Sequence, residues 1–462
     1  MSQLPRGWVE TNFEDVCDYI QRGKGPKYAE FSEYPVVNQK AVRWFGIQEE
    51  HLKYVHPEQW DKWDELRYIR EGDILWNSTG TGTIGRACHI DQTQLSKAKV
   101  VDSHITIVRT NKLVESKFAF YWIMHPEIQG NINGLYNGST NQVELSKKII
   151  ESTRFPLAPL AEQTCIVKKL DEVLAQVEAT QARLARIPDI IKLFRQSVLS
   201  AAVSGKLTEE WRIKHANTPW LDGVLGDFIN KPTYGSSAKS DKDGLVPVLR
   251  MGNLQNGKLD WTELVYTSDE VEIKKYKLRT GDVLFNRTNS PELVGKTSIY
   301  RGERTAIYAG YLIKISCLPV LNPEFLNYHL NSPSARAYCY AVKSDGVSQS
   351  NINAKKLAEY PMSLPQPAEQ TEIVRRVEQL FTYADSIEQQ AKAAKARVDN
   401  LTQAILAKAF RGELTADWRA ANPDLISGDN SAAALLARIQ AERATASGKK
   451  GKRGTSKTRT TD

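Results

Sequence analysis

The fold of this chain is decided by residues 161–212, which read AEQTCIVKKLDEVLAQVEATQARLARIPDIIKLFRQSVLSAAVSGKLTEEWR, and by a second copy at residues 368–419, which reads AEQTEIVRRVEQLFTYADSIEQQAKAAKARVDNLTQAILAKAFRGELTADWR. The copies align without a gap at a constant offset (368 − 161 = 207). Both begin with Ala-Glu-Gln-Thr and end with Gly-x-Leu-Thr-x-x-Trp-Arg, whereas the residues between them share mainly their apolar spacing. The middle of the repeat is therefore constrained in shape and its ends in residue identity.

Each copy of the repeat is predicted to be a long amphipathic helix. Apolar residues recur at spacings of three and four, as in a coiled coil, and about 43 residues at ~1.5 Å each give roughly 65 Å. Pro188 should kink or break the first helix, because proline removes a backbone hydrogen bond, whereas Lys395 stands at that position in the second. Gly205 and Gly412 are the expected helix stops. Two such helices in one chain most naturally pair antiparallel.

The composition indicates a globular chain of more than one domain. Its 462 residues are too many for one core, and they are 41% hydrophobic and 25% charged. We find no run of eighteen apolar residues and no signal-peptide pattern, so we expect neither a membrane span nor secretion. The five scattered cysteines are expected to be free thiols, which favours a cytoplasmic location.

The net charge of +8 is concentrated at the C-terminus. Residues 443–462 hold seven Lys or Arg and one acid (7 − 1 = +6), which leaves about +2 for the rest of the chain. The tail ASGKKGKRGTSKTRTTD is of low complexity and is predicted to be disordered. Any nucleic-acid surface on the body must therefore be a local patch.

The globular parts are duplicated too, at a similar period. Residues 71–77 (EGDILWN) correspond to residues 280–286 (TGDVLFN). Short β-rich runs alternate with polar loops and a helical run at residues 117–124, which indicates an α+β fold. The predicted organisation is a first globular domain (1–153), the helix of the first repeat (154–217), a second globular domain (218–359), the helix of the second repeat (360–421), and a short helix with a basic disordered tail (422–462).

Two strings suggest catalysis but do not support it. Residues 80–85 (GTGTIG) match the dinucleotide-binding pattern, which requires a helix to open there, whereas residues 86–91 look like a strand. A flexible polar loop between two strands is the favoured interpretation. Asp102, Ser103 and His104 are adjacent in an extended segment, so their side chains alternate faces and cannot form a triad. We expect no catalytic residue and no metal ligand.

The loops that correspond between the two halves are rich in residue types that bind DNA. Arg and Lys pair with guanine edges and phosphates, and Asn and Gln pair with adenine edges. An ordinary solvated loop is the alternative for any single residue, but the pairing of the loops across the duplication favours a joint role. The candidate DNA-binding residues are Arg22, Lys24, Lys27, Arg43, Asn77, Thr79, Arg86, Ser139, Thr140, Asn141, Gln142, Lys239, Arg250, Asn286, Arg287, Asn289, Lys296, Ser348, Gln349 and Asn351.

The identical residues stand at the ends of the repeat, where contact between the two helices does not by itself require them. We interpret them partly as structural junctions and partly as docking surfaces. A duplicated chain presents two similar surfaces related by a pseudo-twofold axis, a geometry that accepts two copies of one partner. The candidate partner-binding residues are Glu162, Gln163, Trp211, Arg212, Glu369, Gln370, Trp418 and Arg419.

Several of these segments closely resemble one known family. They are residues 156–163 (PLAPLAEQ), residues 205–212 (GKLTEEWR), residues 409–415 (AFRGELT) and the paired strands GDILWN and GDVLFN. They resemble the specificity (S) subunit of type I DNA restriction-modification systems, most of all the enteric type IA subgroup. The resemblance covers nearly the whole chain, and the two helical copies are its specific part.

The resemblance implies a non-catalytic subunit that recognises double-stranded DNA. Each globular domain would be a target recognition domain that reads one half of a split, asymmetric site, and the helices would be the spacer. Two methyltransferase (M) subunits would hold S-adenosylmethionine and methylate adenine, and two restriction (R) subunits would use ATP and Mg, so this chain would carry no cofactor. Two alternatives are a coiled-coil scaffold that binds only proteins and an enzyme that acts alone.

Overall fold

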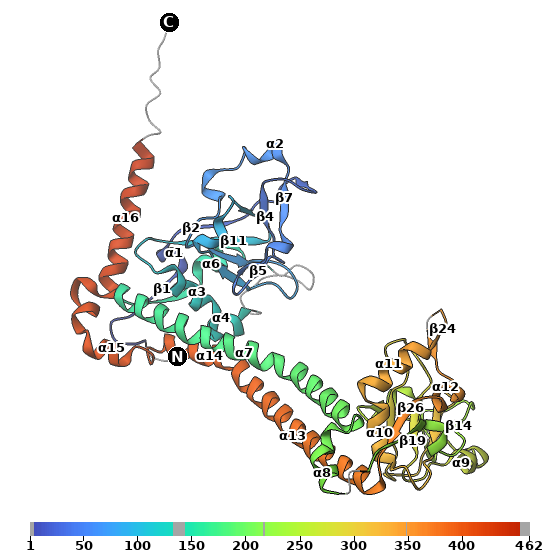
Figure 1. Ribbon diagram of the computed structural model, residues 1–462. Helices are drawn as coiled ribbons and strands as arrows, with labels where there is room; N and C mark the ends of the chain where they lie inside the picture. Colours follow the sequence, from blue (N-terminus) through green and yellow to red (C-terminus); the bar gives the residue numbers. More distant parts are fainter. Residues whose placement is uncertain (1–3, 133–143, 216–217, 348, 453–462) are drawn as a thin grey trace. The chain divides into compact units, whose positions relative to one another are not determined.

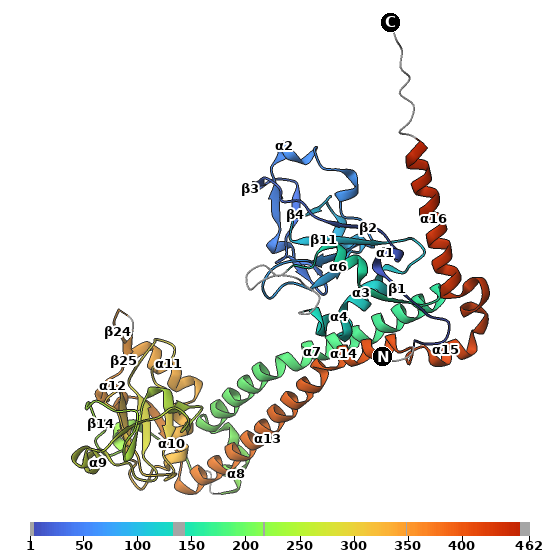
Figure 2. The same ribbon diagram turned by 180° about the vertical axis from the view of Figure 1, so that it is seen from behind.

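The computed structural model describes residues 4–132, 144–215, 218–347 and 349–452. The chain forms two compact units, which we call unit 1 (Met1–Ala182 with Lys395–Asp462) and unit 2 (Arg183–Ala394). Each unit therefore contains one globular domain and about half of each repeat. Both are mixtures of helix and sheet (Figures 1 and 2), which confirms the predicted α+β class.

The central sheet of unit 1 has its strands in the order β2-β11-β8-β9. Its middle strand β8 is buried at every position, because apolar side chains point to both faces of the sheet. The GTGTIG loop joins β8 to its antiparallel neighbour β9, so the prediction of a polar loop between two strands is confirmed. The bounds of these strands are β2 Cys17–Arg22, β8 Ile74–Asn77, β9 Ala87–His89 and β11 Ile105–Thr110.

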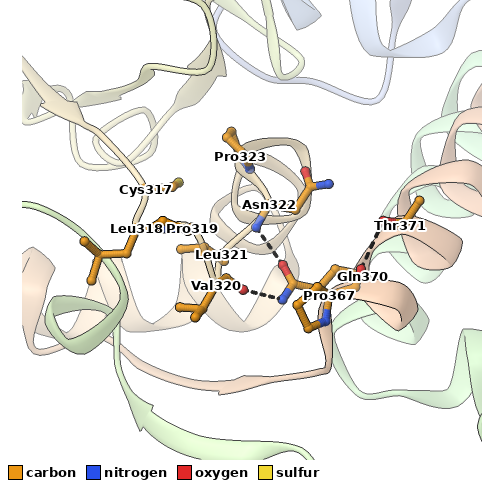
Figure 3. A pocket seen from close by; sticks show the side chains of 10 residues that line it. All are labelled: Cys317, Leu318, Pro319, Val320, Leu321, Asn322, Pro323, Pro367, Gln370 and Thr371. Atoms are coloured by element: carbon orange, nitrogen blue, oxygen red, sulfur yellow. Dashed lines mark hydrogen bonds between the residues drawn. The ribbon is translucent and has the colours of Figure 1, made fainter.

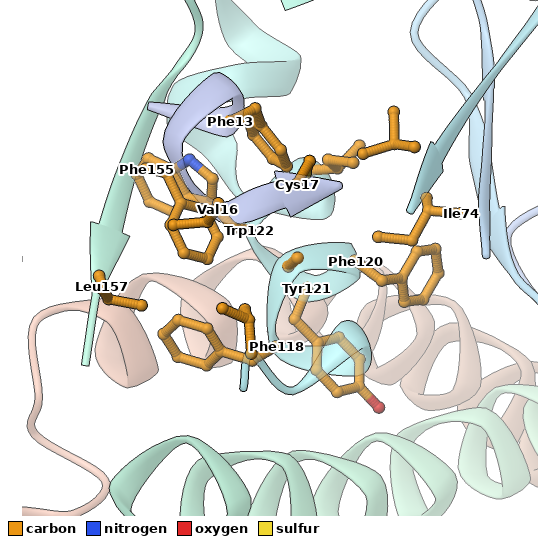
Figure 4. Packing of buried hydrophobic residues seen from close by; sticks show 14 of the residues in the cluster. Phe13, Val16, Cys17, Ile74, Phe118, Phe120, Tyr121, Trp122, Phe155 and Leu157 are labelled. Carbon is orange, nitrogen blue, oxygen red and sulfur yellow. The ribbon is translucent and has the colours of Figure 1, made fainter. Parts of the chain in front are cut away.

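Helix α3 (Ser116–Met124) fills the space between this sheet and the long helices of unit 1 (Figures 1 and 2). Its aromatic residues Phe118 and Trp122 belong to the same buried cluster as Phe13 and Phe155 (Figure 4). The remaining elements of the domain are β1 (Val9–Asn12), α1 (Phe13–Val16), β3 (Tyr28–Ala29), β4 (Pro35–Val37), β5 (Val42–Arg43), β6 (Gly46–Ile47), β7 (Lys53–Val55), α2 (Pro57–Trp60), β10 (Val100–Val101), α4 (Pro126–Gly130), α6 (Lys147–Ser152) and β12 (Arg154–Leu157).

Unit 2 repeats this plan. Its central sheet, β14-β23-β19-β21, corresponds to β2-β11-β8-β9, and β4 and β10 pair in parallel just as β15 and β22 do. The elements are α8 (Glu209–Lys214), β13 (Leu221–Val224), β14 (Thr233–Tyr234), β15 (Val246–Leu249), β16 (Leu254–Gln255), β17 (Lys258–Leu259), β18 (Val265–Thr267), α9 (Glu270–Tyr276), β19 (Val283–Asn286), β20 (Thr288–Asn289), β21 (Thr297–Ile299), β22 (Ile307–Tyr308), β23 (Leu312–Ile315), α10 (Pro323–Leu330), α11 (Pro333–Val342), β24 (Ser344–Asp345), β25 (Ser350–Asn351), α12 (Ala354–Ala358) and β26 (Pro361–Leu364).

In unit 1 the start of α7 (Leu160–Val203) pairs with the end of the second repeat, which includes α14 (Leu401–Phe410). Lys169 donates to the carbonyl of Leu414 at 2.8 Å, and Gln181 donates to Asp399 at 3.2 Å. Along α7 the residue numbers of these contacts rise, whereas in the second repeat they fall, so the two segments are antiparallel. Between them lies a shared apolar core, formed by Ile166, Leu170, Leu406 and Phe410.

In unit 2 the end of α7 pairs with the start of α13 (Pro367–Asp399). Arg195 donates to Asp385 at 2.7 Å, and Arg376 donates to the carbonyl of Leu207 at 2.8 Å. This pairing is antiparallel as well. The expected antiparallel helix pair is thus confirmed within each unit, and each pair is built from both copies of the repeat.

The helix ends differ from expectation in two places. Gly205 and Gly412 have φ values of +76° and +72° just after α7 and α14, so both predicted helix stops are confirmed. Pro188 was predicted to kink or break the first helix; the break is wrong, because α7 continues through Pro188, and the kink stays a prediction. Pro188 has no N–H, so one backbone carbonyl in the preceding turn lacks its helical hydrogen bond. Pro188 lies on the exposed face, where water can donate to that carbonyl instead. The second copy is instead interrupted at Asn400, between α13 and α14.

The C-terminal segment begins with α15 (Ala416–Ala421) and ends in α16 (Ala432–Lys452), which is the short helix predicted within residues 422–462. The helix takes in residues 446–452, which were predicted to be disordered, and the rest of that tail lies outside the described residues. Within the part of the chain that the structure describes, no helix is both long and apolar enough to cross a membrane.

Candidate nucleic-acid interface

In unit 1 the candidate interface starts at Asn77, the last residue of β8. The Asn77 side chain is fully buried and its amide nitrogen donates to the carbonyls of Gln39 at 3.0 Å and Thr83 at 3.2 Å. Asn77 therefore fixes the glycine-rich loop that follows it against the loop after β4. This is a positioning role, because the buried amide itself is not available to a ligand.

Two further candidates, Arg22 and Thr79, lie at the same end of the sheet. The hydroxyl of Thr79 is 2.7 Å from Nδ1 of His104, and Arg22 donates to the carbonyl of the adjacent Ser103. Arg22 is also ion-paired with Glu144. The structure thus brings the predicted residues Arg22, Asn77 and Thr79 to one group of loops.

Arg43 and Arg86 complete this group. Both guanidinium groups lie 3.4 Å from the carbonyl oxygen of Val42, and Arg43 also donates to Gln48 at 2.8 Å. Burial lowers the pKa of Arg86, and the neighbouring positive charge of Arg43 lowers it further. Two like charges are therefore held close together at the start of β9.

In unit 2 the corresponding loops carry different side chains. The guanidinium of Arg287, directly after β19, lies 4.6 Å over the ring of Tyr234. Asn351 donates to the hydroxyl of Thr288 at 2.8 Å, and β20 pairs with β25 so that Asn289 lies opposite Ser350. Three predicted residues, Arg287, Asn289 and Asn351, are thus brought together. Tyr234 was missed, because nothing in the sequence links it to a loop 53 residues later (287 − 234 = 53).

Asn286 and Lys296 are the equivalents of Asn77 and Arg86. The Asn286 side chain is fully buried, and neither of its amide atoms has a hydrogen-bond partner among the described residues. Lys296 donates to Gln255 at 3.1 Å, and its pKa is lowered by burial and by the charge of Arg336. Arg336 comes from α11 and was also missed, because its helical position carries no loop or strand pattern.

The other candidates are spread over the surface or lie outside the described residues. Lys24, Lys239, Arg250 and Gln349 are exposed, and Lys27 is ion-paired with Glu58. The structure does not join these five side chains to the groups above. The remaining candidates, which fall outside the described residues, are Ser139, Thr140, Asn141, Gln142 and Ser348.

The side chains at the ends of the repeat form hydrogen bonds to other residues of this chain. In unit 1 the buried carboxylate of Glu162 accepts hydrogen bonds from Trp8 at 2.9 Å, from Thr415 at 2.6 Å and from Arg419. In unit 2 the carboxylate of Glu369 accepts from the corresponding residues, which are Trp220 at 3.0 Å, Thr208 at 2.7 Å and Arg212 at 2.9 Å. We call each set a Glu-Arg lock. Both join the start of one repeat copy to the end of the other.

The glutamines that follow have the same internal role. Gln370 accepts from the backbone of Asn322 at 2.7 Å and donates to the carbonyl of Val320 at 2.8 Å, which fixes the loop lining the depression in Figure 3. Gln163 accepts from the backbone of Glu115 at 2.9 Å. The interpretation of these ends as docking surfaces is corrected for Glu162, Gln163, Glu369 and Gln370, because their side chains are buried and bonded within the chain.

Arg212 and Arg419 are committed to the locks, so their donors face inward. Trp211 and Trp418 stay predicted partner contacts, since both are partly exposed and lie on the short helices α8 and α15. Trp211 stacks on His215 with ring centroids 4.1 Å apart. The lock residues Trp8 and Trp220 were missed, because they lie outside the constant offset of the repeat.

Comparison with known proteins agrees with this duplicated arrangement. The profile of the Type I restriction modification DNA specificity domain matches the chain twice, at residues 5–189 and 218–395. The chain is 37% identical to the EcoKI specificity subunit of Escherichia coli K12, over 98% of both proteins. It is 44% identical to the EcoBI specificity subunit of Escherichia coli, over 69% of this chain and 71% of that protein. It is 34% identical to the StySPI specificity subunit of Salmonella potsdam, over 97% and 98%.

Solved structures share the fold. A chain from a study of complex assembly and conformational transition in a type I restriction-modification system has a TM-score of 0.66 at 20% identity, over 89% of this chain and 99% of that one. The HsdS subunit from Thermoanaerobacter tengcongensis has a TM-score of 0.59 at 20% identity, over 89% and 98%. At this level of identity the likeness concerns the fold alone.

Proposed function

The chain belongs to the type I restriction-modification specificity family, and we propose that it recognises a bipartite DNA site, one half-site with each unit. The observation that carries this proposal is the repeated construction of the two interfaces. In each unit a buried central strand ends in a buried asparagine, Asn77 or Asn286, and is followed by a polar loop and a cation.

The two interfaces share their framework but differ in the side chains they offer. Unit 1 presents Thr79 beside His104, whereas unit 2 presents Arg287 stacked on Tyr234, with Asn351 beside it. Different donors and acceptors select different bases, so the two half-sites should differ in sequence. Each good bidentate contact discriminates by ~1–3 kcal/mol, so a few contacts in each unit suffice for specific binding.

We propose that the chemistry resides in the partners. Two M subunits would hold S-adenosylmethionine and take the target adenine out of the duplex, and R subunits would supply the ATP- and Mg-dependent steps. The helices of unit 2 expose the large apolar side chains Ile190, Leu193 and Tyr383, which are suited to a protein partner. Trp211 and Trp418 are the candidate docking residues of the repeat ends.

The proposal is tested by binding to random DNA duplexes. The full chain, purified with its M subunits, is mixed with a random library, and the retained duplexes are sequenced. We expect a split motif with a fixed gap. Retention without sequence preference would favour the alternative of a scaffold that binds only proteins. Methyl transfer or cleavage by the chain alone would favour the other alternative, an enzyme that acts by itself.

A further inference from the structure

Two cations meet at the same place in each unit. In unit 1 these are Arg86 and Arg43, whose guanidinium groups lie 3.4 Å from one carbonyl oxygen, that of Val42. Lys296 is the structural equivalent of Arg86, because the carbonyls of both accept from the backbone of the equivalent asparagines, Asn77 and Asn286, at 2.8 Å. The second cation of unit 2 is Arg336.

The two pairs are assembled from different elements. Arg43 comes from β5 of the β5-β6 hairpin, and Gln255 stands on the corresponding hairpin, β16-β17, where it accepts from Lys296. Gln255 carries no charge, so the second cation of unit 2 comes from another element. It is Arg336 of α11, which donates to the carbonyl of Val294, two residues before Lys296, at 3.4 Å. Each unit thus has one cation at the equivalent position, Arg86 or Lys296, and a second cation that comes from a different element in each unit.

No carboxylate neutralises these pairs in the part of the chain that the structure describes, whereas Arg22 and Arg109 of the same domain are paired with Glu144 and Asp73. Residues 133–143, outside the described part, contain neither Asp nor Glu. The bonds of Arg86 to carbonyl oxygens are at the long limit of 3.4 Å, so its donors retain capacity for a ligand. Two partly buried, unneutralised cations held together form a site for an anion.

We infer that the Arg43–Arg86 pair and the Lys296–Arg336 pair each bind a backbone phosphate of DNA, one at each half-site, and set the register of each unit without reading bases. The inference rests on the proposed function and deepens it. The equivalent position holds Arg86 in unit 1 and Lys296 in unit 2, which favours a phosphate over a base as the ligand. A phosphate needs only positive charge, whereas a guanine edge needs the planar fork of arginine.

The test measures how DNA binding depends on salt. The logarithm of the binding constant falls with the logarithm of salt concentration, and each lost phosphate contact reduces the slope by about one. The variants are Arg86→Gln and Lys296→Gln, with Arg86→Lys as a charge-retaining control in case the Gln variant is unstable. Matched controls are Lys147→Ala and Lys355→Ala, at equivalent positions in the two units, whose lysines are paired with Glu151 and Glu359.

We expect both Gln variants to reduce the slope by about one and to weaken specific and random DNA alike, with an unchanged methylated motif. Arg86→Lys and both control variants should keep the wild-type slope. An unchanged slope for Arg86→Gln and Lys296→Gln, a motif altered in one half, or weaker assembly with the M subunits at an unchanged slope would overturn the inference. Failure of the proposed function is distinct, because the wild-type complex itself would then lack sequence preference.

Discussion

Arg419 donates a hydrogen bond to the buried carboxylate of Glu162, a residue 257 positions earlier in the chain. The equivalent bond in unit 2 joins Arg212 to Glu369 at 2.9 Å, across 157 positions. The buried glutamate near the start of each repeat copy is thus paired with the arginine at the end of the other copy. Neither unit is complete without both repeats, which explains why the ends of the repeat are identical in the two copies.

The lock of unit 1 should be essential to the stability of that unit. Arg419→Ala leaves the Glu162 carboxylate buried with one cation fewer, and breaking a buried pair in this way costs ~3–5 kcal/mol. Hydrogen exchange should therefore rise in peptides of β1, β12 and α3 and stay unchanged in unit 2. The matched control is Arg411→Ala, whose partner Glu413 is exposed, and its effect on stability should be small because water screens an exposed pair. Equal costs for the two variants would contradict this role.

Gly412 should tolerate no side chain. Its φ is +72°, and an added Cβ would lie 2.6 Å from the guanidinium of Arg419, the cation of the lock. Left-handed backbone costs an L-residue roughly 1–2 kcal/mol, and displacement of Arg419 adds to that cost. Thermal unfolding should show Gly412→Ala to be clearly destabilised. Gly130→Ala in the same unit, where an added Cβ meets nothing within 4 Å, should be near neutral.

Unit 2 should lose stability in acid through His329. Burial lowers the pKa of His329 to about 4, and its Nδ1 lies 3.0 Å from the hydroxyl of Tyr360. Because the folded state has the lower pKa, the stabilisation is present above about 6.5, the ordinary value, and declines as pH falls toward 4. Hydrogen exchange in unit 2 between these pH values measures the effect. His329→Gln should flatten the pH dependence, and the exposed His215→Gln should not.

The paired helices should set the gap between the half-sites. The chain crosses from one unit to the other within α7, after Ala182, and within α13, after Ala394. Four residues, about one helical turn, inserted at both points lengthen both helices and leave the two locks intact. Methylome sequencing should then show a changed gap between unchanged half-sites. The same insertion at Gly428, which lies outside α7, α13 and α14, should leave the gap as it was. Altered half-site bases would refute the spacer role.

Local patterns in the sequence predicted the helices, their glycine stops and the duplicated strands, because spacing and turn chemistry act over a few residues. They could not reveal the locks. Two copies of Glu and Arg show that these residues matter, but not that each Glu is bonded to the Arg of the other copy. Burial of Glu162 and Glu369 is a tertiary property, so side chains that looked suited to docking proved internal.

The sequence predicted only part of each interface, because it again marks local patterns and not tertiary contacts. Arg43, Asn77 and Arg86 share loops that correspond across the duplication, and the structure brings them together. Tyr234 and Arg336 join their groups from distant elements, and no short-range pattern marks them. Pro188 shows the opposite error, since a local rule allowed a break at a position where α7 continues.

The central claim, that each unit reads one half of a split site, is tested most directly by methylome sequencing of hosts that carry domain exchanges. One host carries the wild-type chain with its M subunits. A second carries a chain in which residues 218–359 are replaced by the corresponding segment of a relative. We predict a split motif in the first host, and in the second a change confined to one half-site, with the other half and the gap retained. A continuous motif, or a change in both halves, would contradict the account.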